Sequence, residues 1–220
     1  MAATTAARPL PRRRLATGWI LIWALPLVAI GGLFYPVLGF ALILCMLGPA
    51  VVALFRGRYW CGWICPRGAF ADLVLSRVSP HRQAPAVLRR TWLRVALLAF
   101  LMTVLGVQLA LAWGRVGGMG MAFVRILIVT TLAGVVMALI WHERAWCAVC
   151  PMGSLASWLA RRKRPLQVSD ACASCKACEK ACPMQLAPHQ GAGADCLKCE
   201  SCIACCPKNA LAFACDEPAA

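Results

Sequence analysis

Long runs of apolar residues dominate the first two thirds of the chain. Four of them are each long enough to cross about 30 Å of hydrocarbon at about 1.5 Å per residue. They are Gly18–Tyr35, Val37–Phe55, Trp92–Trp113 and Met121–Trp141. The remainder is polar and rich in cysteine. The pattern predicts an all-α membrane bundle of four transmembrane helices (residues 18–164), followed by a small C-terminal domain (165–220).

Composition supports this division. Of the 220 residues, 61% are hydrophobic and 14% are charged, whereas soluble domains are roughly half apolar and a quarter charged. The composition is therefore typical of an integral membrane protein.

The formal net charge of +15 is distributed unevenly. Residues 1–164 hold 19 Lys and Arg against two acids, Asp72 and Glu143, while residues 165–220 hold four Lys and six Asp or Glu. Basic residues between apolar runs are typical of membrane-orientation signals. Since no basic face lies outside those connections, we expect no nucleic-acid partner.

The basic residues also predict an orientation. The N-terminal arm (1–17) has four Lys or Arg, the 31–36 turn none, the 56–94 stretch eight, the 115 turn one and the 144–164 stretch five. By the positive-inside rule, the arm, the middle loop and the C-terminal domain face the cytoplasm, with both termini there. No convincing cleavage site follows the first run, so we expect it to be retained as an anchor.

A short motif occurs twice. Arg58-Tyr-Trp-Cys61-Gly-Trp-Ile-Cys65-Pro follows the second run, and Arg144-Ala-Trp-Cys147-Ala-Val-Cys150-Pro follows the fourth. The membrane domain is therefore predicted to be two helical-hairpin repeats, each ending in a cytoplasmic Cys-x(2,3)-Cys-Pro loop.

These four cysteines (Cys61, Cys65, Cys147 and Cys150, hereafter the loop cysteines) allow several interpretations. Each pair precedes a proline at the expected start of a helix, where a thiol pKa is lowered. The pairs could be redox-active dithiols, ligands of a shared metal, or half-sites of a further cluster. They could also only pack the turn.

The C-terminal domain contains a doubled cysteine run. Cys172-x2-Cys175-x2-Cys178-x3-Cys182-Pro is followed by Cys196-x2-Cys199-x2-Cys202-x3-Cys206-Pro. Three closely spaced thiolates wrap one cubane, and the fourth reaches the other cubane. We therefore predict two [4Fe-4S] clusters in a small α+β bacterial ferredoxin-like domain. The first cysteine set is Cys172, Cys175, Cys178 and Cys206; the second cysteine set is Cys196, Cys199, Cys202 and Cys182.

The alternative is structural zinc, which also uses cysteines two residues apart. Neither the third cysteine of each run nor the trailing Cys-Pro fits a zinc ribbon. Cys205 and Cys215 are surplus to the motif, and we expect both to pack beneath a cluster. Cys205 could compete with Cys206 as a ligand, although the spacing favours Cys206.

The two loop motifs and the doubled run together resemble the membrane polyferredoxin family, from the first span to Pro207. That family includes NapH-type subunits of periplasmic nitrate reductase systems, the membrane half of NosR-type proteins and CcoG/FixG-type proteins of oxidase assembly. The resemblance implies a bacterial inner membrane location. It also implies electron transfer between quinol, or a cytoplasmic donor, and a respiratory partner such as another ferredoxin or a cytochrome.

The sequence departs from the family at several points. Cys147 and Cys150 are separated by two residues rather than three, which argues against a strictly symmetric metal site. We also expect neither an N-terminal flavin domain nor a periplasmic domain after the cysteine run, which makes the NapH type the most similar.

No haem, nucleotide or hydrolase motif is present. We therefore expect an electron-transfer subunit rather than a stand-alone enzyme, with quinone as a possible further cofactor. The runner-up is an assembly or regulatory factor that reduces copper or matures a metalloenzyme, because paired thiols suit Cu(I). A third hypothesis is an anchor that only docks other redox proteins.

Six other residues were considered. Arg125 lies within the fourth run and is expected to snorkel to the periplasmic side. His142 and Glu143 are expected to contact headgroups, with proton relay as the alternative, and Cys45 to be a small core residue. His81 has no partner that the sequence can assign, and the same holds for His189.

Overall fold

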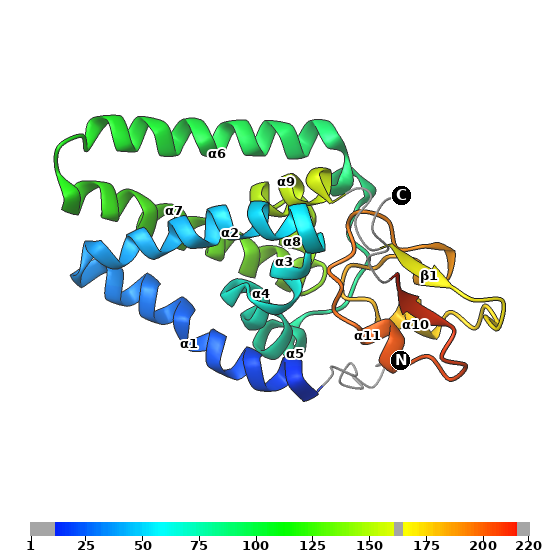
Figure 1. The fold of residues 1–220 in the computed structure, drawn as a ribbon. Helices are drawn as coiled ribbons and strands as arrows, with labels where there is room; N and C mark the ends of the chain where they lie inside the picture. Colours follow the sequence, from blue (N-terminus) through cyan, green and yellow to red (C-terminus); the bar gives the residue numbers. More distant parts are fainter. Residues whose placement is uncertain (1–11, 161–164, 215–220) are drawn as a thin grey trace.

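The computed structural model describes residues 12–160 and 165–214. Most of the predicted basic arm (1–17) and Cys215 therefore lie outside the described residues. Within them, four long helices lie at one end and the cysteine-rich C-terminal part lies at the other (Figure 1).

The four long helices are the predicted spans. They are α1 (Arg12–Phe34), α2 (Ala41–Arg56) with the preceding 3-10 turn η1 (Pro36–Phe40), α6 (Thr91–Leu111) and α7 (Val116–Ile140). Each is long and apolar enough to cross a membrane, with mean hydropathy between 1.9 and 2.6. Their ends differ from the predicted ones by a few residues. The largest difference is at α1, which begins six residues early, inside the segment expected to be the arm.

Glycines allow the second hairpin to pack closely on the first. A methyl group at Gly120 of α7 would collide with the carbonyl oxygen of Pro36, and one at Gly39 would collide with the carbonyl oxygen of Gly120. Side chains would therefore push η1 and α7 apart. This contact fixes the relative position of the two hairpins.

Short helices follow each hairpin. After α2 come α3 (Tyr59–Trp63), α4 (Pro66–Phe70), the π-helical turn η2 (Ala71–Leu75), α5 (Ser76–Val78) and the 3-10 turn η3 (Ala86–Arg89). After α7 come α8 (Ala145–Val149) and α9 (Pro151–Leu159). Figure 1 shows α3, α4, α8 and α9 among the ends of the long helices that lie nearest the C-terminal part. Both α4 and α9 begin at the proline after a cysteine, where a missing N–H leaves no hydrogen bond unmade.

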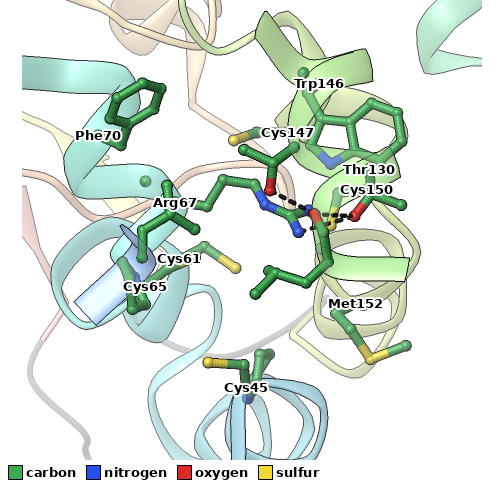
Figure 2. A pocket seen from close by; sticks show the side chains of 18 of the residues that line it. Cys45, Cys61, Cys65, Arg67, Phe70, Thr130, Trp146, Cys147, Cys150 and Met152 are labelled. Carbon is green, nitrogen blue, oxygen red and sulfur yellow. Dashed lines mark hydrogen bonds between the residues drawn. The ribbon is translucent and has the colours of Figure 1, made fainter. Parts of the chain in front are cut away.

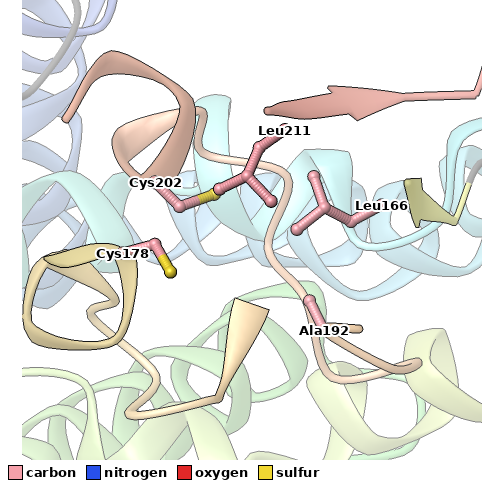
Figure 3. Close-up of a cluster of buried hydrophobic side chains, with 5 residues drawn as sticks. All are labelled: Leu166, Cys178, Ala192, Cys202 and Leu211. Atoms are coloured by element: carbon pink, nitrogen blue, oxygen red, sulfur yellow. The ribbon is translucent and has the colours of Figure 1, made fainter. Parts of the chain in front are cut away.

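The C-terminal part combines a two-stranded sheet with short helices. Strands β1 (Leu166–Val168) and β2 (Leu211–Phe213) pair antiparallel, with Leu166 opposite Phe213. Between them lie α10 (Ala177–Ala181), the 3-10 turn η4 (Pro188–Gln190) and α11 (Ser201–Ala204). Its core joins Leu166 and Leu211 to two cysteines of the doubled run, Cys178 and Cys202 (Figure 3).

Candidate functional site

The two halves of the doubled cysteine run share backbone conformations at equivalent positions. Within residues 165–214, six non-glycine residues adopt positive φ, all between 48° and 61°. They form three pairs at equal offsets in the two halves: Ser174 and Lys198, Lys176 and Glu200, Gln185 and Asn209. Such φ values are uncommon for side-chain-bearing residues. Because they turn successive N–H groups to one side, they create concave anion sites of the kind found around iron–sulfur clusters.

Backbone N–H groups approach the cysteine sulfurs. Leu186 N lies 3.5 Å from Cys182 Sγ, and Ala210 N lies 3.4 Å from Cys206 Sγ, again at the same offset in each half. Lys198 N lies 3.4 Å from Cys196 Sγ. Hydrogen bonds to sulfur are one means by which proteins set cluster potentials. The donor set and its N–H environment therefore fit iron–sulfur clusters.

The fold brings the second cysteine set together across the two halves. Burial, together with the nearby thiols Cys199 and Cys182, raises the pKa of Cys196 to about 11. Burial and the other three members of the set likewise raise the pKa of Cys202 to about 12. Four mutually interacting thiols would release protons on binding metal. The predicted ligands of this cluster thus lie in one place.

The first cysteine set is partly brought together. Burial raises the pKa of Cys178, with a contribution from Cys175. Cys205 lies within electrostatic range of Cys178, Cys206 and Cys175. Cysteines from both halves of the doubled run therefore lie close to one another here. Cys205 nevertheless donates its thiol to the carbonyl of Cys202 at 3.4 Å. Cys206 instead repeats the N–H contact of Cys182, so the geometry favours Cys206 as the ligand.

Two arginines form hydrogen bonds between the two loops that carry the loop cysteines. Arg58, three residues before Cys61, donates to the carbonyl of Cys147 at 2.8 Å. Arg144, three residues before Cys147, donates to the carbonyl of Cys61 at 3.0 Å. Each side chain is 1% exposed. The exchange is reciprocal, so the two loops face one another.

Glycines make this exchange possible. A methyl group at Gly153 would lie 2.6 Å from the Arg58 guanidinium, and one at Gly68 would lie 2.8 Å from that of Arg144. Each glycine lies three residues after the last cysteine of its loop. A larger residue at either position would displace the arginine of the other loop.

Two aspartates that the sequence did not identify as site residues balance these arginines. Asp72 accepts two hydrogen bonds from Arg144, at 2.8 and 2.7 Å, and pairs with Arg14. Asp195, next to Cys196, accepts from Arg94 at 3.0 and 2.8 Å and from Arg58 at 3.2 Å. The available signal for Asp72 was its rarity, as one of two acids among the first 164 residues.

A cavity of about 390 Å³ lies among the spans, and all four loop cysteines line it. Its wall is otherwise mostly apolar and includes Cys45 from α2. Figure 2 shows the Arg67 side chain reaching across this cavity to Thr130, to which it donates at 2.9 Å. The predicted membrane cysteine pairs therefore share one cavity, whereas spacing alone left them as two separate loops.

The expectation of lowered thiol pKa values in these loops is wrong for the first pair. Burial raises the pKa of Cys65 to about 12, and it also raises that of Cys61 despite the nearby Arg58. The short helix α4 offers less stabilisation to a thiolate than loss of water removes.

The C-terminal part docks onto the first of these loops. Trp63 Nε1 donates to the carbonyl of Lys198 at 2.9 Å, and a methyl group at Gly62 would collide with the carbonyl oxygen of Leu197. Around the buried side chain of Leu197, Cys61 and Cys147 pack with Cys182 and Cys199. Two loop cysteines therefore lie in one cluster with two members of the second cysteine set.

The polar residues at the end of the fourth span are buried. His142 and Glu143 are 1% and 3% exposed, and Glu143 lies 3.1 Å from His81 Nδ1. The headgroup-contact expectation is therefore wrong, and His81 has a partner that the sequence could not assign. Arg125 lies on the exposed side of α7, as snorkelling requires.

Two segments of this chain match a known domain model. A 4Fe-4S binding domain model matches twice, at residues 38–85 and 122–168. Each match contains one pair of loop cysteines, and both end before Cys172. No solved structure matches this chain.

Several curated relatives are similar over most of the chain. Ferredoxin-type protein NapH of Haemophilus influenzae is 27% identical over 201 residues, covering 77% of this chain and 68% of that protein. The methylamine utilization ferredoxin-type protein MauN of Methylobacillus flagellatus is 30% identical (63% and 54%). The putative electron transport protein YccM of Escherichia coli is 26% identical (82% and 57%). The chain thus spans little more than half the length of MauN and YccM.

The spans, the cysteine runs and these relatives define a ferredoxin-type membrane protein that binds 4Fe-4S clusters and transfers electrons. At 26–30% identity, the chain is similar to ferredoxin-type membrane proteins of the NapH type. The resemblance inferred from the loop motifs is confirmed.

Proposed function

We propose that this protein carries electrons between the quinol pool, or a cytoplasmic donor, and a respiratory redox partner. It would use two [4Fe-4S] clusters held by the first and second cysteine sets of a ferredoxin-like domain. Bound clusters supply one-electron chemistry. The chain's own residues hold them, exclude water and connect them to the membrane.

The observation that carries this proposal is the continuity between cavity and cysteines. The cavity among the spans is lined mostly by apolar side chains, and its polar lining residues are Arg58, Arg67, Thr130, Thr131, Glu143 and Arg144. That composition is typical of sites for small organic cofactors. At its end, Cys61 and Cys147 pack with Cys182 and Cys199. A quinol in the cavity would therefore lie next to the second cysteine set.

The orientation proposed from the positive-inside count fits this arrangement. Both loops and the C-terminal part lie at the same end of the helices (Figure 1). We place that end in the cytoplasm of a bacterial cell with an inner membrane, together with both termini. The two hairpin repeats of the proposed architecture would then each end in a loop on the cytoplasmic side.

The decisive experiment is anaerobic. Purified protein in detergent is mixed with a quinol analogue, and cluster absorbance and EPR are followed. Bleaching by quinol, absent in a Cys175→Ser/Cys199→Ser variant that still inserts, is expected. Reduction by dithionite but not by quinol would exclude quinol as the donor. Full transfer activity in the double variant would refute the whole proposal.

A second candidate function is copper reduction or maturation of a metalloenzyme. Besides the loop cysteines, the cavity is lined by Met46, Met102 and Met152, and thiolates and thioethers both suit Cu(I). Stoichiometric copper in the purified protein, lost on substitution of the loop cysteines, would favour this function over the respiratory one.

A further inference from the structure

The loop cysteines have the arrangement of one shared site. Cys61 lies within electrostatic range of both Cys147 and Cys150, and Cys65 lies within range of Cys61 and Cys147. In Figure 2, Cys61 and Cys65 lie on one side of the Arg67 side chain, and Cys147 and Cys150 lie on the other. The reciprocal hydrogen bonds of Arg58 and Arg144 hold the two pairs in this position.

The charges around the site call for an anion. Arg14, Arg58, Arg94 and Arg144 share two carboxylates, Asp72 and Asp195. A fifth arginine, Arg67, makes no ion pair within the described residues; it bonds Thr130, and its Nε is buried without an acceptor. Of these five arginines, Arg58, Arg67 and Arg144 line the cavity, and the carboxylate that lines it is Glu143, which bonds His81. Asp72 and Asp195 pair with arginines from outside the cavity wall, so five arginines in and around the site are accompanied by three carboxylates. Burying such an excess is unfavourable without a counter-charge.

Two indole N–H groups at the site also lack acceptors. Trp60 and Trp146 each precede the first cysteine of a pair, and both side chains line the cavity. The Nε1 atoms of both are buried without a hydrogen-bond partner within residues 12–160 and 165–214. Buried donors normally find acceptors. Two equivalent donors beside four thiols would suit a sulfur-rich group.

We propose that the loop cysteines together bind a third iron–sulfur cluster, with two ligands from each loop. A cluster with four thiolate ligands carries a net charge of about −2, which would balance the excess of arginines. Its sulfurs would accept the indole N–H groups. The match of both loop regions to a 4Fe-4S binding domain supports the assignment.

A cluster explains the spacing better than a single ion does. Among the described residues, no three His, Cys, Asp or Glu side chains converge closely enough to hold one metal ion. The same is true of the second cysteine set, where a cubane is proposed. Ligands spread around a multi-iron core are wider apart than the tetrahedral ligands of zinc.

The site would lie between the cavity and the second cysteine set. Cys61 and Cys147 already pack against Cys182 and Cys199. The inference rests on the proposed function only for its electron-carrying role. Binding of the cluster does not depend on whether quinol is the donor.

The test is the iron and acid-labile sulfide content of protein purified without oxygen. The wild type should hold about twelve irons per chain, against about eight for two [4Fe-4S] clusters alone. Cys61→Ser/Cys147→Ser should lose iron and an equal amount of sulfide and retain about eight irons, with one Mössbauer component missing. Cys45→Ser, which removes a thiol from the same cavity, is the matched control and should retain the wild-type content.

The outcomes are distinct. A wild type with about ten irons, falling to about eight, supports the same site with a two-iron cluster. About eight irons in the wild type overturns the inference, even where the double variant does not fold. Zinc or copper bound to the loop cysteines instead of iron also overturns it. A third cluster that quinol fails to reduce supports this site and refutes only the proposed donor.

Discussion

Asp195 connects the C-terminal part to the rest of the protein through ion pairs. Its carboxylate accepts hydrogen bonds from Arg94 of α6, Arg58 of the first loop and Ser157 of α9, the last at 2.7 Å. Asp195→Asn keeps the size of the side chain and removes its charge. Arg58 and Arg94, which are 1% and 5% exposed, would then remain buried without a carboxylate.

The magnitude follows from that burial. Removing one partner of a buried ion pair destabilises by about 3–5 kcal/mol. The Asp195 side chain is 23% exposed, so we take the lower end, about 3 kcal/mol. At about 1.4 kcal/mol per factor of ten, undocking of the C-terminal part should become roughly a hundredfold more frequent.

Hydrogen exchange measures this undocking. The segment 196–199 packs on the first loop, and the backbone N–H of Lys198 is bonded to Cys196 Sγ. We expect its exchange, followed by mass spectrometry in detergent, to accelerate by roughly the same hundredfold factor if opening is at equilibrium. The control is Asp170→Asn, because Asp170 is exposed and makes no ion pair within the described residues. Equal exchange in the two variants would refute the reasoning.

Three further outcomes are expected. Gly62→Ala places a methyl group against the carbonyl of Leu197 and should accelerate hydrogen exchange in the segment 196–199. Gly106→Ala, with open space around it, is the control and should leave that exchange unchanged. Equal exchange in the two variants would contradict the packing argument. Cys206→Ser should lose the iron of one cluster and Cys205→Ser should not, by metal analysis; the reverse would exchange their roles. Burial raises the pKa of Asp195, but hydrogen bonds from Arg94 and Ser157 and the charge of Arg58 lower it overall, below 3.8. Its contribution to docking should therefore be complete above about pH 4 and fall as pH drops through the lower folded value; an exchange difference between wild type and Asp195→Asn that shrinks already between pH 8 and 5 would contradict this.

The sequence alone determined the parts of this protein whose signals are local. A span is set by some twenty consecutive apolar residues, so the ends of all four were predicted to within six residues. The cysteine spacing of the doubled run determined the cluster motif, because a turn of fixed length between thiols depends on residues close in sequence. The loop motifs indicated the resemblance to NapH-type proteins for the same reason, because they too are local patterns.

Tertiary structure decided how these parts meet. The pairing of Arg58 with Asp195 joins residues 137 positions apart, and no local pattern encodes such a distance. The sharing of one cavity by Cys61, Cys65, Cys147 and Cys150 depends on how the glycines allow η1 and α7 to pack. The raised thiol pKa values likewise follow from burial, which is a property of the packed chain and not of the helix start that the sequence displays.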